Sequence, residues 1–134
     1  MVAVTGAASG VGRLLVQRLA APEGSAAPRE VIAIDDEFAD LRGVTWRIAD
    51  VCDPALVSRL GGVDVLVHTA DDRSPDRRPA DRRAHNIRAA QTVLTAAAAS
   101  GVPRVLLVTS TMVYGAAPDN PVPLPENTAR VSDN

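Results

Sequence analysis

Three glycines lie close together near the start of the chain, within residues Thr5–Gly12 (TGAASGVG). This run follows a short apolar segment and opens a segment with helical periodicity, which is the context in which such a pattern binds a dinucleotide. Gly6 permits a tight turn, Gly10 lets the backbone approach a pyrophosphate, and Gly12 lets a helix pack closely on a strand. The N–H groups and the dipole of that helix then favour phosphate groups. The alternative is a simple strand-to-helix connection that needs small residues.

A carboxylate follows at the distance that a dinucleotide site requires. Asp35 ends the second apolar segment, about twenty residues beyond the glycines. It can accept hydrogen bonds from both ribose hydroxyls of an adenosine, and it repels a 2′-phosphate. No arginine precedes Gly12 in the turn, so we predict NAD rather than NADP as the cofactor. The alternative is an ordinary strand-end aspartate, an interpretation that also applies to the neighbouring Asp36.

Five short apolar segments are expected to form the sheet that positions these residues. They are Val2–Val4, Val31–Ile34, Val44–Ile48, Val63–Val67 and Val105–Val108. Their near-continuous apolarity favours strands that are covered on both faces. A doubly wound, Rossmann-like α/β fold follows, with a parallel sheet of at least five strands in the order 3-2-1-4-5.

Helix signals separate the predicted strands. The first helix ends at Pro22 and has one apolar face, formed by Val11, Leu14, Leu15 and Leu19. A loop is expected over Pro22–Glu30. Asp53 and Pro54 begin a second helix, which Gly61 and Gly62 end. A third is expected over Ala80–Ala99, with Gly101 at its C-terminal cap and Pro103 beyond.

The last part of the chain has a different composition. Residues 116–134 hold four prolines and show neither strand nor helix periodicity. We therefore predict one dinucleotide-binding domain over residues 1–115 and a Pro-rich, irregular tail over residues 116–134. Residues 71–79, which mix arginine with aspartate, are predicted to form a solvated loop.

Charge and cysteine content exclude several classes of partner. The net charge of −2 gives no general attraction to nucleic acid or to an anionic membrane. No apolar stretch approaches the roughly 18 residues needed to cross a bilayer. Cys52 is the one cysteine, which rules out an internal disulfide and favours a cytoplasmic location. No metal site is predicted from His68 and His85, because no further ligands occur at suitable spacing.

Further runs resemble the extended branch of the short-chain dehydrogenase/reductase family, which contains nucleotide-sugar epimerases and dehydratases. The run ADVCD at residues 49–53 is similar to the branch's Gly-Asp-(Val/Ile)-Arg-Asp, and residues 67–70 (VHTA) resemble a strand end that reads His-Leu-Ala-Ala. Residues 86–90 (NIRAA) resemble Asn-Val-x-Gly-Thr, and residues 108–115 (VTSTMVYG) resemble Ser-Ser-x-x-Val-Tyr-Gly.

The resemblance implies a role for individual residues. Asp50 and Val51 are expected to contact adenine, and Thr69 and Ala70 to lie beside the cofactor's ribose and pyrophosphate. Ser110 takes the place of the branch's catalytic hydroxyl, although a serine there can also be a simple strand-end cap. The predicted cofactor-binding residues are Gly6, Ser9, Gly10, Val11, Gly12, Asp35, Asp50, Val51, Thr69, Ala70 and Asn86.

Two features depart from that branch. The glycine spacing is that of the shorter, single-domain branch of the family. The Tyr-x-x-x-Lys pair that carries out proton transfer in the family has no counterpart, because all fourteen basic residues are arginine and the one tyrosine, Tyr114, is followed four residues later by Pro118.

These observations predict the NAD(H)-binding portion of a nucleotide-sugar epimerase/dehydratase-type oxidoreductase, without its catalytic Tyr/Lys pair. Whether the chain is itself an enzyme stays open, as does its substrate. The alternative is a non-catalytic NAD(H)-binding module that senses redox state. An unpaired fifth strand also predicts self-association.

Overall fold

The computed structural model describes residues 1–21, 27–115 and 118–128. Regular elements follow in the order β1 (Val2–Thr5), α1 (Gly10–Ala20), β2 (Val31–Asp35), β3 (Thr45–Ile48), η1 (Pro54–Arg59), β4 (Val65–His68), α2 (Pro79–Ala99), β5 (Arg104–Leu107) and η2 (Thr111–Tyr114), where η denotes a 3-10 helix. Each predicted strand is present, and no strand end differs from its predicted position by more than two residues.

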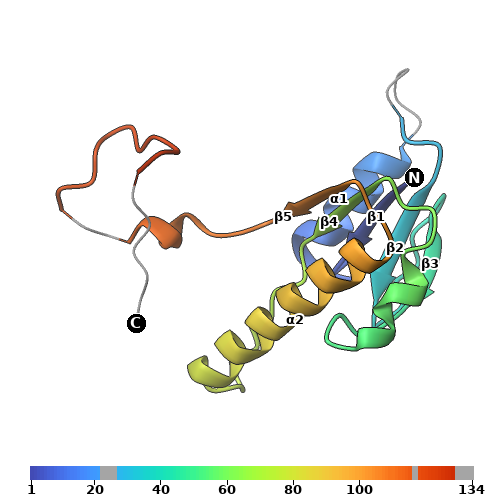
Figure 1. Ribbon diagram of the computed structural model, residues 1–134, viewed down its shortest axis with the longest axis horizontal. Coiled ribbons are helices and arrows are strands. Elements are labelled where there is room, and N and C mark those ends of the chain that lie inside the picture. Colours follow the sequence, from blue (N-terminus) through green and yellow to red (C-terminus); the bar gives the residue numbers. More distant parts are fainter. Residues whose placement is uncertain (22–26, 116–117, 129–134) are drawn as a thin grey trace.

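The five strands form one parallel sheet in the order β3-β2-β1-β4-β5. The predicted fold class and strand order are therefore confirmed. The last residue of β1, Thr5, is paired with Ile34 on one side and with His68 on the other. Since all strands run the same way, their carboxyl ends meet at one edge of the sheet (Figure 1).

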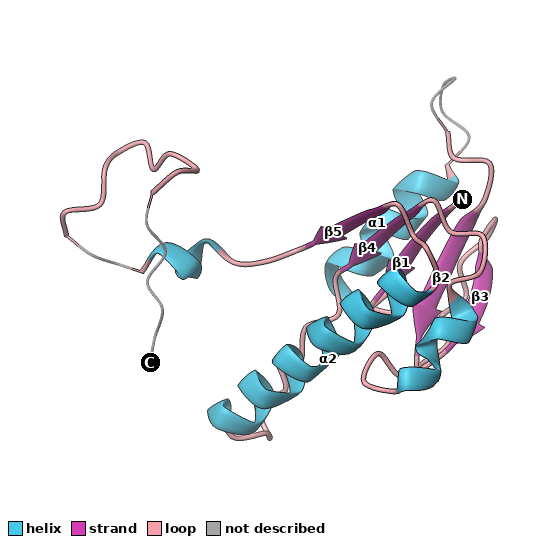
Figure 2. Ribbon diagram, in the orientation of Figure 1, coloured by secondary structure: helices cyan, strands magenta, loops and turns pink. Residues whose placement is uncertain are grey.

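Apolar side chains form one layer on each face of the sheet, and α1 and α2 cover opposite faces (Figure 2). Alternate residues of the strands point to opposite layers, as in β2, where Ile32 and Ile34 face one layer and Val31 and Ala33 face the other. The first layer is completed by η1 and by Val93, Ala96 and Ala97 of α2. The second is completed by Val16 of α1. Coverage of β1, β2 and β4 on both faces explains why the sequences of these three strands are almost continuously apolar.

The predicted apolar face of α1 was correct for Leu15 and Leu19 and wrong for Val11 and Leu14. Val11 and Leu14 are 60% and 67% exposed, whereas Gly12 and Val16 are the buried residues of the helix. Leu15 and Leu19 pack at the edge of the core. The helix turns the side that carries Gly12 toward the sheet, because the missing side chain lets that side approach most closely.

The remaining helix predictions were correct in position. Asp53 caps η1 by accepting a hydrogen bond from the Ala55 N–H at 2.8 Å, and Pro54 is its first residue. This helix is of the 3-10 type, and β2 joins β3 without a helix. The third predicted helix corresponds to α2.

The chain leaves the sheet after β5 and runs away from it (Figure 1). Residues 118–128 contain neither helix nor strand. Pro22, which was predicted to end the first helix, lies outside the described residues, as do residues 116–117 and 129–134 of the predicted tail. The boundary between domain and tail at residue 115 stays a prediction.

Candidate functional site

From β1 the chain continues to β2 and then β3, which lie on one side of β1. It then crosses to β4 and β5, which lie on the other side. The order of strands therefore reverses between β1 and β4, and open parallel sheets bind ligands at the carboxyl edge beside such a switch point. Thr5 and His68 end the two strands there, and the glycine-rich residues 6–12, hereafter the glycine turn, follow Thr5 directly.

The glycine turn lies against the residues that follow β4. Gly6 has a φ of +75°, and a Cβ atom placed on it would meet the backbone nitrogen of Ala70 at 2.6 Å. A Cβ atom on Gly12 would lie 2.0 Å from the Gly6 carbonyl oxygen and 2.4 Å from the Thr69 Oγ1. Both positions exclude any side chain, so the turn and the first turn of α1 pack directly on residues 69–70.

Gly10, in contrast to Gly6 and Gly12, lies beside open space. It has a φ of +51°, and a Cβ atom there would meet no atom within 4 Å. Ser9 precedes it as the N-cap of α1 without a side-chain capping hydrogen bond, and the first turn contains no acidic residue. Open space beside an uncapped helix N-terminus suits an anionic group such as a pyrophosphate.

Asp35 lies beside this turn. Its Oδ2 accepts a hydrogen bond from the Ala8 N–H at 2.9 Å, and its Oδ1 accepts one from the Glu37 N–H at 3.3 Å. A carboxylate has about four lone-pair sites, so acceptor capacity remains for ribose hydroxyls. Asp35 therefore joins the end of β2 to the glycine turn.

Negative charge gathers around Asp35. A hydrogen bond with the Asp35 side chain is the main cause that raises the pKa of the Asp36 carboxyl, followed by burial and by the charges of Asp35 and Asp50. The Ala49 N–H donates to the Asp35 carbonyl oxygen at 2.9 Å, which brings the loop after β3 alongside. The exposed Asp50 on that loop accepts a hydrogen bond from the Cys52 N–H at 2.7 Å, and Val51 packs against the core.

Cys52 contacts α2 through His85, with its Sγ 3.7 Å from the Nδ1 atom of the ring. Burial, followed by the charge of Asp50, raises the pKa of the Cys52 thiol, while Arg88 and Arg77 oppose the shift. A protonated thiol is a poor nucleophile. In the described part of the chain, no three His, Cys, Asp or Glu side chains are placed to hold a metal ion.

A buried polar pair joins β1 to β4 beneath the glycine turn. The Oγ1 of Thr5, which is fully buried, shares a hydrogen bond of 2.7 Å with the Nδ1 of His68. Burial lowers the pKa of His68, although the charge of Asp71 works against this shift. This shift favours the neutral imidazole, whose Nδ1 takes part in the hydrogen bond with Thr5. No sequence pattern predicted this pair, since the two residues are 63 positions apart.

Asn86 holds the loop that follows β4. Its side-chain oxygen accepts a hydrogen bond from the Asp72 N–H at 2.8 Å, and its amide nitrogen donates to the Asp71 carboxylate and to the Asp72 carbonyl oxygen. The Arg77 guanidinium pairs with the Asp72 carboxylate. Asn86 therefore positions the loop beside the predicted cofactor site from α2.

The candidate catalytic residue Ser110 lies three residues beyond the end of β5. It follows β5 on the segment that runs away from the sheet (Figure 1), and its carbonyl oxygen accepts a hydrogen bond from the Val113 N–H. Tyr114 is near the end of η2, where its hydroxyl donates to the Glu126 carbonyl oxygen at 3.5 Å. The other predicted site residues gather around the carboxyl ends of β1, β2, β3 and β4.

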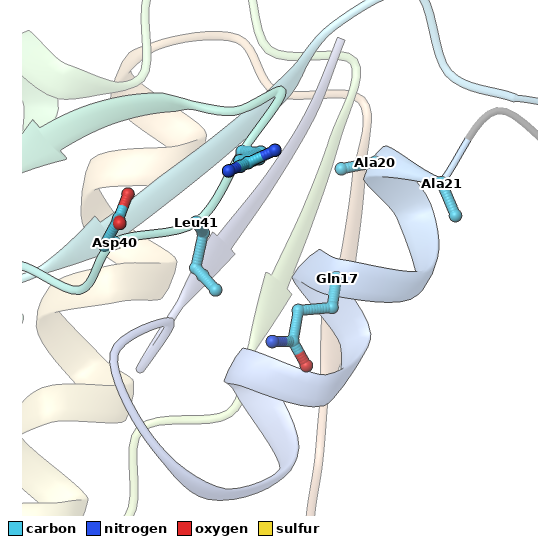
Figure 3. A pocket seen from close by; sticks show the side chains of 6 residues that line it. Gln17, Ala20, Ala21, Asp40 and Leu41 are labelled. Atoms are coloured by element: carbon cyan, nitrogen blue, oxygen red, sulfur yellow. The ribbon is translucent and has the colours of Figure 1, made fainter.

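A hollow of about 380 Å³ lies at the other end of α1 (Figure 3). It is lined by Gln17, Ala20, Ala21, Asp40, Leu41 and Arg42. None of the predicted site residues lines it. An α-helix rises about 1.5 Å per residue, so the hollow is separated from the glycine turn by most of the length of α1.

One family model matches residues 2–133 of the chain, that of the NAD dependent epimerase/dehydratase family. A comparison with curated proteins found no match. Among the described residues, no helix has both the length and the apolarity to cross a membrane.

Several solved structures are similar to the chain. A dTDP-glucose 4,6-dehydratase from Streptomyces venezuelae, crystallised with NAD, is 31% identical over 88% of this chain and 42% of its own, with a TM-score of 0.74. A short-chain dehydrogenase/reductase superfamily protein from Agrobacterium tumefaciens with bound NAD is 29% identical over 100% of this chain and 40% of its own, with a TM-score of 0.75. A uronate dehydrogenase from Agrobacterium tumefaciens, complexed with NAD, is 26% identical over 85% of this chain and 42% of its own, with a TM-score of 0.69. The chain thus spans about two fifths of the length of these proteins.

Proposed function

Because the chain belongs to the NAD-dependent epimerase/dehydratase family, we propose that it forms the NAD(H)-binding part of an oxidoreductase that acts on nucleotide sugars. The observation that carries this proposal is the glycine turn at the switch point of the sheet, joined to Asp35 by the hydrogen bond from the Ala8 N–H. Similar proteins crystallised with NAD support the choice of cofactor.

The residues present fit this cofactor. The open space at Gly10 and the uncapped N-terminus of α1 suit the pyrophosphate. Asp35 retains acceptor capacity for the adenosine ribose. Asp50 and Val51, on the loop that the Ala49 N–H joins to Asp35, are proposed to contact adenine. Ser9 and Ala70 are proposed to lie beside the pyrophosphate.

When bound, NAD accepts a hydride from the carbon of an alcohol. This chain's contribution is to hold the cofactor and to orient it at the carboxyl edge of the sheet. We propose that Ser110 donates a hydrogen bond to the oxygen of the reacting carbon, a role that requires the segment after β5 to reach that edge.

The first test is the preference between NAD and NADP. We expect the protein to bind NAD at least tenfold more tightly, because Asp35, with Asp36 and Asp50 nearby, repels a 2′-phosphate. Two unit charges about 4 Å apart interact by about 1 kcal/mol in water and about 4 kcal/mol at an effective dielectric constant of about 20, and about 1.4 kcal/mol corresponds to tenfold. Calorimetric titration with both dinucleotides measures the preference.

The substitution Asp35→Ala should reduce the preference for NAD over NADP. Asp40→Ala is the matched control, since Asp40 is an exposed carboxylate on the β2–β3 connection that lines the hollow at the other end of α1. Tighter binding of NADP by the unmodified protein would contradict the assignment of Asp35. An equal effect of the two substitutions would show that general charge, rather than a ribose contact, determines the preference.

A non-catalytic NAD(H)-binding module is the second candidate function. The observation that favours it is the absence of lysine from the 134 residues, since the resembled family uses a Tyr-x-x-x-Lys pair. Sequencing the gene beyond the codon for Asn134 discriminates the two. A downstream Tyr-x-x-x-Lys supports the oxidoreductase, and a stop codon supports the module.

We also propose that the 134-residue polypeptide associates with itself through β5. This strand ends the sheet. The Val108 N–H donates to the His68 carbonyl oxygen, so residue 108 faces β4, and the alternation along a strand turns the peptide groups of Val105 and Leu107 to the open edge. Leu106 and Leu107 are 52% and 40% exposed. An unpaired apolar edge promotes association.

Light scattering should therefore detect dimers or larger species of the purified polypeptide. Leu107→Lys should shift the population toward the monomer, because a charge then lies on the edge strand. Leu14→Lys is the matched control, since Leu14 is an equally apolar, exposed residue on α1. A monodisperse monomer of the unmodified polypeptide that unfolds cooperatively would contradict this proposal.

A further inference from the structure

The hydroxyl group of Thr69 lies beneath the glycine turn. Its Oγ1 donates to the Thr5 carbonyl oxygen at 2.7 Å and lies 3.4 Å from the Gly6 carbonyl oxygen. The same Oγ1 is 2.4 Å from the position that a Cβ atom on Gly12 would take. One side chain thus contacts the residue before the turn, the first glycine of the turn and the start of α1.

We propose that Thr69 is a positioning residue, which holds the glycine turn in the conformation that binds the pyrophosphate. This inference rests on the proposed function as an NAD(H)-binding protein. It assigns Thr69 an action through the turn, whereas the resemblance to the family implied a place directly beside the cofactor.

The peptide groups of the turn are held from two sides. On the β4 side, Thr69 binds the carbonyl oxygens of Thr5 and Gly6. On the β2 side, the Ile34 carbonyl oxygen accepts hydrogen bonds from the Gly6 N–H at 3.0 Å and the Ala7 N–H at 3.4 Å. A peptide bond is planar, so fixing its oxygen also fixes the direction of its N–H. Thr69 therefore limits the rotation of the peptide planes on which the turn depends.

The stability of the fold depends less on this hydroxyl than the geometry of the glycine turn does. The Thr5 carbonyl oxygen also accepts a hydrogen bond from the Thr69 backbone N–H at 3.1 Å, so it keeps a partner when the side chain is removed. Loss of the hydroxyl leaves no buried acceptor at Thr5 unsatisfied, the situation that costs most in stability. The effect should appear in the geometry of the turn more than in the free energy of unfolding.

In this chain the hydroxyl occurs together with Gly12, whose lack of a side chain leaves room for it against the start of α1.

The test compares Thr69→Ala with Thr69→Ser. Alanine removes the hydroxyl without adding bulk, and serine keeps it, so the difference between the variants isolates the hydrogen bonds. Dissociation constants are measured by NMR titration for NAD, for ADP-ribose, which keeps the pyrophosphate, and for adenosine, which lacks it. The thermal unfolding midpoint is measured for each protein without ligand.

We expect Thr69→Ala to weaken binding of NAD and ADP-ribose by about three- to tenfold, the range that a lost hydrogen bond gives. Adenosine binding should be unchanged, and Thr69→Ser should restore the two affinities. Equal affinities for NAD in all three proteins would overturn the inference. It would also be overturned by an equal loss for adenosine, or by an alanine variant that fails to fold while the serine variant folds, since Thr69 would then support the fold in general.

The same measurements distinguish an error in the proposed function from an error in this inference. If the unmodified protein binds neither NAD nor ADP-ribose, the NAD(H)-binding assignment is wrong, and the role of Thr69 falls with it. If the unmodified protein binds both and the alanine variant binds them equally well, only the role of Thr69 is wrong.

Discussion

Gly12→Ala is expected to prevent the native packing of α1 and to abolish measurable NAD binding. The new Cβ atom would lie 2.0 Å from the Gly6 carbonyl oxygen, 2.4 Å from the Thr69 Oγ1 and 2.7 Å from the Gly6 carbonyl carbon. Two of these three atoms belong to the backbone of Gly6, so movement of the Thr69 side chain alone cannot make room. The helix or the turn must shift, and both form the proposed pyrophosphate site.

The cost in stability should be large. Overpacking of a core typically costs about 1–3 kcal/mol, and contacts with backbone atoms at these distances place this substitution at or above the upper end. A domain has a free energy of unfolding of about 5–15 kcal/mol, so the loss is a substantial fraction of it. Thermal unfolding followed by circular dichroism, together with calorimetric titration of NAD, measures both effects.

Gly61→Ala provides the matched control for this substitution. Gly61 lies between η1 and β4, and a Cβ atom there would meet no atom within 4 Å. Its φ is not in the left-handed region, so alanine should be tolerated with little change in stability. Equal unfolding midpoints and equal NAD affinities for the two variants would contradict the close packing of α1 on the glycine turn.

The second large effect is the absence of turnover by the 134-residue polypeptide. Oxidation of an alcohol requires removal of its proton as well as transfer of a hydride, and the family's Tyr-x-x-x-Lys pair has no counterpart among these residues. Tyr114 is the one tyrosine, and its hydroxyl contacts the Glu126 carbonyl oxygen. Arginine does not replace the lysine, because its planar guanidinium lacks the compact charge of an ammonium group.

The two histidines are poorly placed to serve as the missing base. His68 is buried and bonded to Thr5, and His85 contacts Cys52 on the side of α2 that faces the loop after β3. Loss of general-base catalysis typically lowers a rate by about 10²–10⁴-fold. We therefore expect no turnover of nucleotide sugars above the background rate, even when NAD is bound.

The assay follows NAD reduction and epimer formation with a panel of nucleotide sugars. The same preparation is first shown by calorimetry to bind NAD, so that an inactive result cannot arise from unfolded protein. Turnover within tenfold of about 10 s⁻¹, a typical median for enzymes, would contradict the prediction and would require a base among the residues present.

The sequence by itself determined the local parts of this protein. Each apolar segment predicted a strand within one or two residues, and Asp53 with Pro54 marked the start of η1. The turn at Gly6 and the strand end at Asp35 were likewise predicted. These features depend on backbone conformation and on burial within a few neighbouring residues, and a sequence pattern reports both directly. The strand order followed from general rules for parallel sheets.

Only the tertiary structure decided which residues meet across the molecule. The face that α1 buries depends on how closely Gly12 approaches Gly6 and Thr69. The exposed apolar residues Val11 and Leu14 made the sequence periodicity misleading. The pairing of Thr5 with His68 joins residues 63 positions apart, and that of Cys52 with His85 joins residues 33 apart. Such contacts are determined by strand register and helix placement, which arise from the packing of the whole sheet with its helices. The physical reason is that a local pattern specifies how a segment folds, whereas its partners depend on where every other segment is packed.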